Sequence, residues 1–333
     1  MAPDQNHLIQ QSQDLPRVLV LHEQTIFDDL RRFHSHKYHF ILLPSTDTTV
    51  DQFLNAHNYD SSSICAVVCS YVRVTADVLR HLPSLGLLVT PSAGTNHIDL
   101  PECCRRGIKV ANIGTVFSED VADFAVCMLI DLMRKISAGD RFMRSRRNSL
   151  AAPCHFPPGS KVRGKRVGIV GLGSIGTEIS RRLEALGCII SYNSRTKKSK
   201  VPYTYYPNVV DLATSCDVLI ISCSLNDQTR HIISREVMLA LGKEGVIVNV
   251  GRGAVIDEKE LVKCLVKGEI GGAGLDVFED EPNVPKELFD LDNVVLSPHS
   301  SALTSESVRG VIEVLGQNLE AFFSNKPLIT PVL

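Results

Sequence analysis

Three polar segments in the second half of the chain could together bind and protonate a small acid. Arg252 lies between two glycines, directly after the apolar run 246–250. Its planar guanidinium suits a carboxylate or an α-keto acid, and the glycines would let the backbone expose it. The acids of 276–281 and the imidazole of His299 follow the next two apolar runs. Because ligands of open α/β sheets bind at the carboxyl ends of the strands, we expect these side chains at one site.

An imidazole bonded to a carboxylate can act as a general acid near neutral pH, because the carboxylate stabilises the protonated ring and fixes its tautomer. Of the eleven histidines, only His299 directly follows an apolar run of this half of the chain. A surface arginine in a turn and a structural histidine are the alternatives. The neighbouring strand ends, next to a candidate nucleotide site, favour the chemical interpretation.

That nucleotide site is predicted from 167–176, an apolar run that becomes a Gly-x-Gly-x-x-Gly turn and then a helix. The glycines would allow a sharp turn, a pyrophosphate against bare backbone, and close packing of the helix on the strand, while the helix amides face the anion. A glycine turn without a ligand is the alternative, but a second apolar run at 188–192 supports the site. The residues expected to bind here are Gly171, Gly173, Ser174, Ile175 and Gly176.

The loop 193–200 indicates which nucleotide binds. An NAD-preferring site usually has an acid about 20 residues after the glycines, whereas this loop has no carboxylate and four cations. The hydroxyls of Ser194 and Thr196 and the guanidinium of Arg195 would bind a 2′-phosphate. A solvated basic loop is the alternative; we predict NADPH in preference to NADH.

Apolar runs alternate with segments of helical spacing along the whole chain, which predicts an α/β protein with two doubly wound parallel-sheet domains. The expected pair is a Rossmann cofactor domain and a flavodoxin-like substrate domain. The first domain should contain five strands, and the second six strands at 167–170, 188–192, 218–223, 246–250, 273–277 and 294–296.

A long helix is expected over 119–145 and a last helix over 305–323, which is free to return to the first domain. The predicted domains are therefore a discontinuous substrate-binding domain, 1–115 with 300–333, and a dinucleotide-binding domain, 116–299.

Composition sets limits on partners and location. The net charge of −2 among 333 residues gives no reason to expect nucleic acid or membrane. No apolar run approaches the roughly 20 residues that span a bilayer, and 1–16 is polar. The ten cysteines are scattered without a zinc spacing. We expect a cytoplasmic protein with reduced thiols and no metal.

In this order and spacing, the glycine fingerprint, VGRG at 250–253, DVFEDEP at 276–282 and SPH at 297–299 resemble the D-2-hydroxyacid dehydrogenases. Within that family the chain is most similar to plant glyoxylate/hydroxypyruvate reductases and hydroxyphenylpyruvate reductases, which share the NSRTKK type of loop. Asn96, the segment 300–302 and the absence of Trp depart from the usual family pattern.

The resemblance implies roles for the residues of the second domain. Arg252 would hold the substrate carboxylate and polarise the keto group, His299 would protonate the carbonyl oxygen, and Glu281 would orient His299. Asp276 would bond the nicotinamide carboxamide. Further contacts to the cofactor are expected from Cys223, Asn226, Thr229 and Val250.

In the first domain the segment 92–99 resembles the family's substrate loop, in which backbone amides near Ala93 and Gly94 bind the carboxylate. Tyr71, in the segment 70–73, would face the tail of the substrate. The resemblance also implies a homodimer and an active site in the cleft between the domains.

The sequence therefore predicts an NADPH-dependent reductase of small 2-oxo acids, converting hydroxypyruvate to D-glycerate and glyoxylate to glycolate. 4-Hydroxyphenylpyruvate is the alternative substrate, because Tyr71 could stack on an aromatic tail. A rival of another class is a nucleotide-sensing interaction protein, since the family also contains co-repressors.

Overall fold

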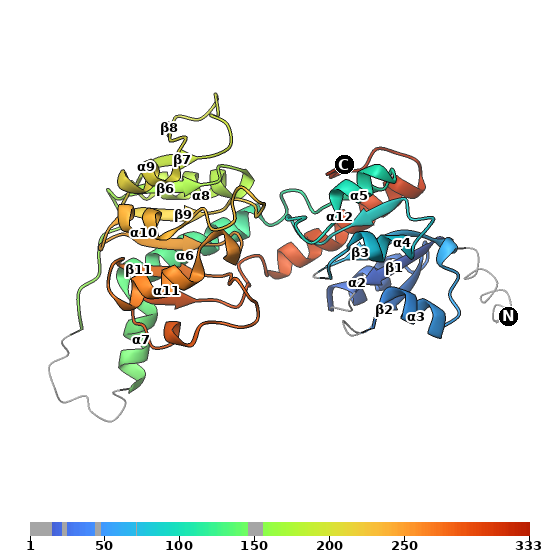
Figure 1. Ribbon diagram of the computed structural model, residues 1–333, viewed down its shortest axis with the longest axis horizontal. Helices are drawn as coiled ribbons and strands as arrows, with labels where there is room; N and C mark the ends of the chain where they lie inside the picture. The colour runs from blue at the N-terminus through green and yellow to red at the C-terminus, as the bar shows by residue number, and fades with distance from the viewer. Residues whose placement is uncertain (1–14, 22–24, 44–47, 71, 146–155) are drawn as a thin grey trace. The chain divides into compact units, whose positions relative to one another are not determined.

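The chain folds into two compact units, which Figure 1 shows as ribbons. Unit 1 comprises Met1–Val116 and Thr304–Leu333, and unit 2 comprises Phe117–Leu303. The computed structural model describes residues 15–21, 25–43, 48–70, 72–145 and 156–333.

Unit 1 is built on a five-stranded parallel sheet of order β2-β1-β3-β4-β5. This is the strand order of flavodoxin-like folds, so the predicted fold class of this unit is confirmed. The strands are β1 (Arg17–Leu21), β2 (His39–Leu43), β3 (Ile64–Cys69), β4 (Leu87–Val89) and β5 (Lys109–Ala111). The helices are α2 (Thr25–His34), α3 (Val50–Ala56), α4 (Ala76–Arg80), α5 (Leu100–Arg105) and α12 (Ser305–Phe323), with a 3-10 turn at Ser61–Ser63.

The C-terminal tail completes the edge of the unit 1 sheet. After α12 the chain runs antiparallel to the edge strand β5, with an isolated bridge between Ala111 and Pro331. The N–H of Val332 donates to the carbonyl of Val110 at 2.8 Å. The tail thereby pairs backbone groups that an edge strand would otherwise leave open.

Unit 2 has a seven-stranded parallel sheet of order β12-β11-β10-β9-β6-β7-β8. Its strands are β6 (Arg166–Val170), β7 (Ile189–Asn193), β8 (Thr204–Tyr205), β9 (Val218–Ile221), β10 (Val246–Asn249), β11 (Gly272–Leu275) and β12 (Val294–Leu296). The six strands expected from the sequence are present, but the count was wrong by one. The extra strand, β8, spans only two residues at the sheet edge, too short for a recognisable period.

Helices cover both faces of the unit 2 sheet. The helices are α6 (Ser118–Arg134), α7 (Ile136–Ser145), α8 (Ser174–Ala185), α9 (Val209–Thr214), α10 (Arg235–Leu241) and α11 (Glu258–Val266), with 3-10 turns at Gly253–Val255 and Lys286–Leu288. Along β9, Leu219 and Ile221 are buried in a cluster with α9, α10 and α11, whereas Val218 and Ile220 are buried in a second cluster with α6 and α8. Because alternate side chains of a strand face opposite ways, these clusters are two cores, and the unit is a doubly wound Rossmann fold, as predicted.

The long helix expected over 119–145 is two helices, so that prediction was wrong at Lys135. This residue has a left-handed φ of 58° and lies between α6 and α7. The carboxylate of Asp131 accepts hydrogen bonds from the N–H of Ser137, at 2.7 Å, and from its hydroxyl. This capping ends one helix and starts the next without a glycine or proline to signal it. None of the described helices is long and apolar enough to cross a membrane.

Candidate active site

Three neighbouring strands of unit 2 bring the predicted reactive side chains to one edge of the sheet. β10, β11 and β12 are adjacent, and Arg252, Glu281 and His299 follow them in that order. The N–H of Ser297 donates to the carbonyl of Leu275 at 2.9 Å, so the loops after β11 and β12 start together. The parallel sheet therefore gathers the three segments at their carboxyl ends.

His299 and Glu281 form a directly bonded pair. Nδ1 of His299 lies 2.8 Å from Oε2 of Glu281, and the N–H of Phe278 donates to Oε1 at 3.0 Å. Because an ionised carboxylate only accepts hydrogen bonds, the bond to Glu281 places the proton of the neutral ring on Nδ1. Both side chains are about one third exposed, 30% for His299 and 35% for Glu281, so the pair is accessible without being fully solvated.

The pKa of Glu281 shows that the carboxylate stays charged. Burial by itself would raise this pKa, but the hydrogen bonds from His299 and from the N–H of Phe278, together with the charge of Arg252, outweigh it and hold the pKa below its usual value. A carboxylate that remains ionised can stabilise the positive charge of a protonated imidazole.

Hydrogen bonds and close backbone packing within unit 2 fix the turn that contains Arg252. The buried amide of Asn249 donates from Nδ2 to the carbonyl of Arg252 at 3.0 Å and accepts from the N–H of Gly251 at 3.0 Å. A Cβ on Gly253 would lie 1.9 Å from the carbonyl carbon of Phe278, so only glycine permits this approach of two backbones. The segment with Arg252 is thereby packed against the segment that leads to Glu281.

Asp276 is completely buried, and its carboxylate is bonded within the protein. Oδ1 accepts from the hydroxyl of Ser297 at 2.7 Å and from the N–H of Ser300 at 2.8 Å, and Oδ2 accepts from the N–H of Ser301 at 3.2 Å. The N–H of His299 also donates to the carbonyl of Asp276 at 2.8 Å. Asp276 therefore positions the loop of His299; its expected contact with a nicotinamide stays a prediction.

The glycine turn after β6 has the geometry of a phosphate cradle. Gly171 has a φ of 98°, and a Cβ there would lie 2.6 Å from the backbone of Cys223. A Cβ on Gly176 would lie 2.3 Å from the carbonyl oxygen of Gly171, so the helix α8 packs closely on the turn. A Cβ on Gly173 would meet nothing within 4 Å. Open space thus lies at the position where the motif leaves room for a pyrophosphate.

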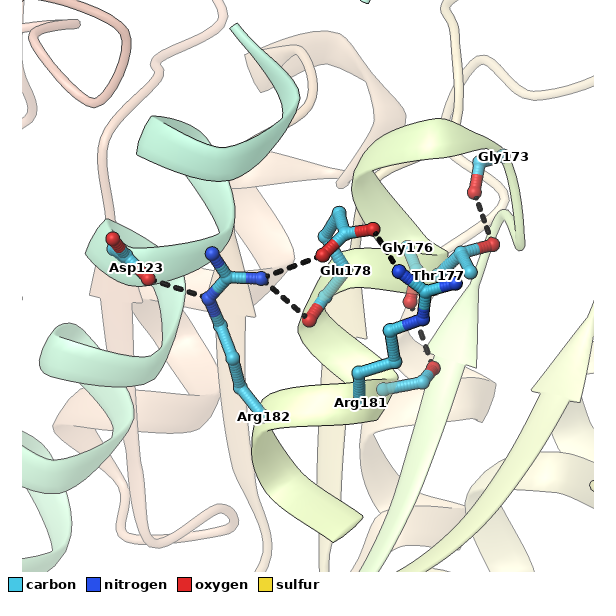
Figure 2. A network of polar contacts seen from close by, with 8 residues as sticks. Asp123, Gly173, Gly176, Thr177, Glu178, Arg181 and Arg182 are labelled. Atoms are coloured by element: carbon cyan, nitrogen blue, oxygen red, sulfur yellow. Dashed lines mark hydrogen bonds and ion pairs between the residues drawn. The ribbon is translucent and has the colours of Figure 1, made fainter. Parts of the chain in front are cut away.

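Side chains on α8 hold this turn and connect the helix to α6, as Figure 2 shows. The hydroxyl of Thr177 donates to the carbonyl of Gly173 at 2.7 Å. The guanidinium of Arg182 bonds to the carboxylate of Asp123 on α6 and, at 2.9 Å, to the carboxylate of Glu178 on its own helix. The last turn of α8 is therefore tied to the neighbouring helix α6.

A cavity of about 800 Å³ lies in unit 2 next to the glycine turn. Eight of the residues predicted to bind the cofactor line it: Gly171, Gly173, Ser194, Arg195, Thr196, Cys223, Asn226 and Thr229. The other five do not line it: Ser174, Ile175, Gly176, Val250 and Asp276. Burial raises the pKa of the Cys223 thiol to about 11, so this lining residue is a neutral thiol.

Tyr205 and Asn208 also line the cavity, and the sequence interpretation missed both. The hydroxyl of Tyr205, on the unpredicted strand β8, lies 3.3 Å from the carbonyl oxygen of Ser194 and donates to it. Asn208 caps α9, since its side chain accepts from the N–H of Val210 at 2.7 Å. An asparagine before an apolar run is a helix-start signal that could have located Asn208.

The predicted substrate loop in unit 1 follows β4. The hydroxyl of Ser92 donates to the carbonyl of Gly94 at 2.6 Å, and the side chain of Asn112 donates to the carbonyl of Ala93 at 2.9 Å. Tyr71 lies outside the described residues. In the part of the chain that the structure describes, no group of three or more His, Cys, Asp or Glu side chains could hold a metal ion.

Residues 126–301 match the family model described as D-isomer specific 2-hydroxyacid dehydrogenase, NAD binding domain. The chain belongs to the D-isomer-specific 2-hydroxyacid dehydrogenase family. The family expected from the sequence motifs is thereby confirmed, together with the expectation of an enzyme.

Several characterised members of this family are similar over most of the chain. A glyoxylate/hydroxypyruvate reductase of Arabidopsis thaliana is 51% identical over 319 residues, 95% of this chain and 97% of the relative. Hydroxyphenylpyruvate reductase of Plectranthus scutellarioides is 45% identical over 274 residues, 82% of this chain and 87% of the relative.

Among solved structures, an NADPH-dependent glyoxylate/hydroxypyruvate reductase of Sinorhizobium meliloti, in complex with NADP and malonate, has a TM-score of 0.86. It is 32% identical, and the match covers 95% of this chain and 96% of that chain.

A D-2-hydroxyacid dehydrogenase works with a nicotinamide dinucleotide, and unit 2 fits that group. The cavity begins at the open side of Gly173, and its lining combines the glycine turn with hydroxyl, amide and cationic side chains. Such groups suit phosphates and riboses. The bonded pair of His299 and Glu281 lies after neighbouring strands of the same sheet.

Proposed function

We propose that this dehydrogenase is an NADPH-dependent reductase that converts hydroxypyruvate to D-glycerate and glyoxylate to glycolate. The observation that carries the proposal is the 2.8 Å bond between His299 and Glu281, beside the turn of Arg252. It supplies a proton donor, and Arg252 supplies a carboxylate-binding cation. The names of the Arabidopsis and Sinorhizobium relatives support this choice of substrates.

In the proposed mechanism, the guanidinium of Arg252 binds the substrate carboxylate and polarises the keto oxygen. In unit 1, the amides at Ala93 and Gly94 are the proposed ligands of a substrate carboxylate. Reduced nicotinamide, when bound, supplies the hydride. Nε2 of His299 donates a proton to the carbonyl oxygen, and Glu281 stabilises the protonated ring through Nδ1 and keeps it oriented.

The preference for NADPH is part of the proposal. Ser194, Arg195, Thr196 and Lys198 line the cavity at the end of β7, where an NAD site usually has an acid. Among the lining residues that the structure describes, only Glu236 is acidic, and it belongs to α10. A 2′-phosphate would therefore meet cations and hydroxyls at this strand end. Comparison of kcat/KM for NADPH and NADH tests the preference; a higher value for NADH contradicts it.

A second substrate is 4-hydroxyphenylpyruvate, favoured by the 45% identity to the Plectranthus enzyme. Hydroxypyruvate, glyoxylate and 4-hydroxyphenylpyruvate should be compared at equal concentration with NADPH. A higher kcat/KM for the aromatic acid than for both small acids would replace the proposed substrates.

The decisive test of the reaction is Arg252→Ala. We expect kcat/KM for hydroxypyruvate to fall at least about 100-fold, since a charged partner of the substrate is lost where charge develops. NADPH oxidation at 340 nm gives the rate, and a melting curve verifies the fold. A folded variant with full turnover would refute the mechanism. The expected homodimer and cytoplasmic location stay predictions, to be tested by light scattering and cell fractionation.

A further inference from the structure

We infer that Asn112 is a positioning residue for substrate binding, because its side chain holds the peptide group between Ala93 and Gly94. The inference rests on the proposed function, in which amides at these two residues bind the substrate carboxylate. It adds a residue that does not touch substrate and that lies 19 positions away along the chain.

The hydrogen bond from Asn112 determines the direction of one N–H group. Nδ2 of Asn112 donates to the carbonyl oxygen of Ala93 at 2.9 Å. In a planar trans peptide the C=O and the following N–H point in opposite directions, and the peptide after Ala93 is not among the cis bonds. Fixing the oxygen of Ala93 therefore also fixes the N–H of Gly94, which is turned away from Asn112.

The next peptide is held in the same way from the core. The hydroxyl of Ser92 donates to the carbonyl oxygen of Gly94 at 2.6 Å and lies 3.0 Å from the hydroxyl of Thr90. Thr90 is completely buried and lies 3.2 Å from Nε2 of His97. The carbonyls of Ala93 and Gly94 are thus both bonded, so the N–H groups of Gly94 and Thr95 are oriented before a ligand arrives. Such preorganisation lowers the cost of binding an anion.

The C-terminal tail determines where Asn112 lies. The N–H of Asn112 donates to the carbonyl of Thr330 at 3.2 Å, and the hydroxyl of Thr330 donates back to the carbonyl of Asn112. That hydroxyl accepts from Nδ2 of Asn318 at 2.9 Å, and Asn318 is completely buried in α12. Oδ1 of Asn112 accepts from the N–H of Gly114 at 2.8 Å. A chain of hydrogen bonds therefore runs from α12 through the tail and Asn112 to Ala93.

The experiment compares neutral variants, which add no charge near an anion. Asn112→Ala removes the donor to Ala93. Thr330→Val removes the tail hydroxyl and keeps the side-chain shape, and Thr330→Ser restores the hydroxyl. Ser63→Ala is the matched control, because it removes another side-chain bond of unit 1, from Arg17 at 2.7 Å.

Two measurements separate positioning from stability and from the proposed reaction. One is the KM for glyoxylate and hydroxypyruvate at saturating NADPH; the other is the Kd of malonate for the NADPH-loaded enzyme by calorimetry. For Asn112→Ala we expect the KM values and the malonate Kd to rise about tenfold. A tenfold rise corresponds to the loss of about 1.4 kcal/mol from the hydrogen bond between the backbone amide and the bound carboxylate. For Thr330→Val we expect a smaller rise, about threefold. The kcat, the NADPH Kd and the melting temperature should change little.

Three results would overturn the inference: wild-type KM and malonate Kd in Asn112→Ala, a parallel loss of NADPH affinity, or an equal rise in Ser63→Ala. Should Asn112→Ala fail to fold, the Thr330 pair decides, since Thr330→Ser must recover what Thr330→Val loses. A wild-type enzyme without turnover would contradict the proposed function alone, because the malonate titration would still test Asn112.

Discussion

Replacing Glu281 with Gln should lower kcat/KM for hydroxypyruvate, because His299 loses its charged partner. The carboxylate accepts from Nδ1 of His299 and from the N–H of Phe278 through different oxygens. Glutamine has one oxygen and no charge, so it can accept only one of these bonds and no longer stabilises a protonated imidazole. The proton donor is then no longer oriented and stabilised by a charged partner.

The size of this effect follows from the geometry of the pair. A hydrogen bond between charged partners contributes about 1 to 1.5 kcal/mol more than a neutral one. Because the two side chains are 30% and 35% exposed, solvent screens part of this difference and the lower end applies. The value of kcat/KM should therefore fall about fivefold, since about 1.4 kcal/mol corresponds to a factor of ten in rate.

The contribution of Glu281 to folding stability depends on pH, because its pKa is depressed in the folded protein. In the folded protein this pKa lies below its ordinary value of 4.5. The carboxylate therefore contributes to stability above pH 4.5, and the contribution is lost as the pH falls below that value through the folded-state pKa. Glu281→Gln should accordingly lower the melting temperature at pH 7 and have little effect at strongly acidic pH.

The assay is kcat/KM for hydroxypyruvate from pH 5 to pH 10. The chain offers a matched control, because His231 and Glu279 form a second pair, also at 2.8 Å, with side chains 39% and 28% exposed. Glu279→Gln should leave kcat/KM unchanged. A folded Glu281→Gln enzyme with wild-type kcat/KM, or an equal loss in Glu279→Gln, would refute this prediction.

Two further predictions concern the cofactor. Gly176→Ala should abolish NADPH binding or prevent folding, because the new Cβ would lie 2.3 Å from the carbonyl of Gly171; fluorescence titration and circular dichroism test this, and a folded variant with normal affinity would contradict it. Arg195→Ala should lower kcat/KM for NADPH about tenfold, by loss of a cation near the 2′-phosphate, and leave the value for NADH unchanged; an equal loss with both cofactors would count against phosphate recognition.

Much of the fold could be predicted because local patterns determine it. The helix Ser305–Phe323 was located to the residue, since its apolar spacing is regular and Thr304 caps its start. The break at Lys135 could not be predicted, because lysine favours helices and the cap comes from a bond between Asp131 and Ser137. The strand β8 has two residues and exists through its pairing with β7, which no local period reveals.

The candidate site, like the fold, could be predicted only in part. Glycine spacing and strand ends predicted the cradle and the place of Arg252, because both follow from the order of strands and turns. The bonds that orient these groups join residues far apart in sequence, such as Asn112 with Ala93 or Asp276 with Ser301, separated by 25 positions. Such contacts depend on tertiary packing, and a single sequence does not encode them as a local signal.

Asp276 illustrates why position alone does not assign a role. His299 has a left-handed φ of 54°, a conformation that persists in a non-glycine residue only where its surroundings determine it. Asp276 supplies those surroundings, since it binds the N–H of His299 through its carbonyl and the following two N–H groups through its carboxylate. Substitution of Asp276 would therefore displace the general acid even if the side chain never contacted a nicotinamide. Loss of turnover in such a variant cannot identify a cofactor contact, whereas unchanged NADPH affinity with impaired proton transfer would identify the positioning role.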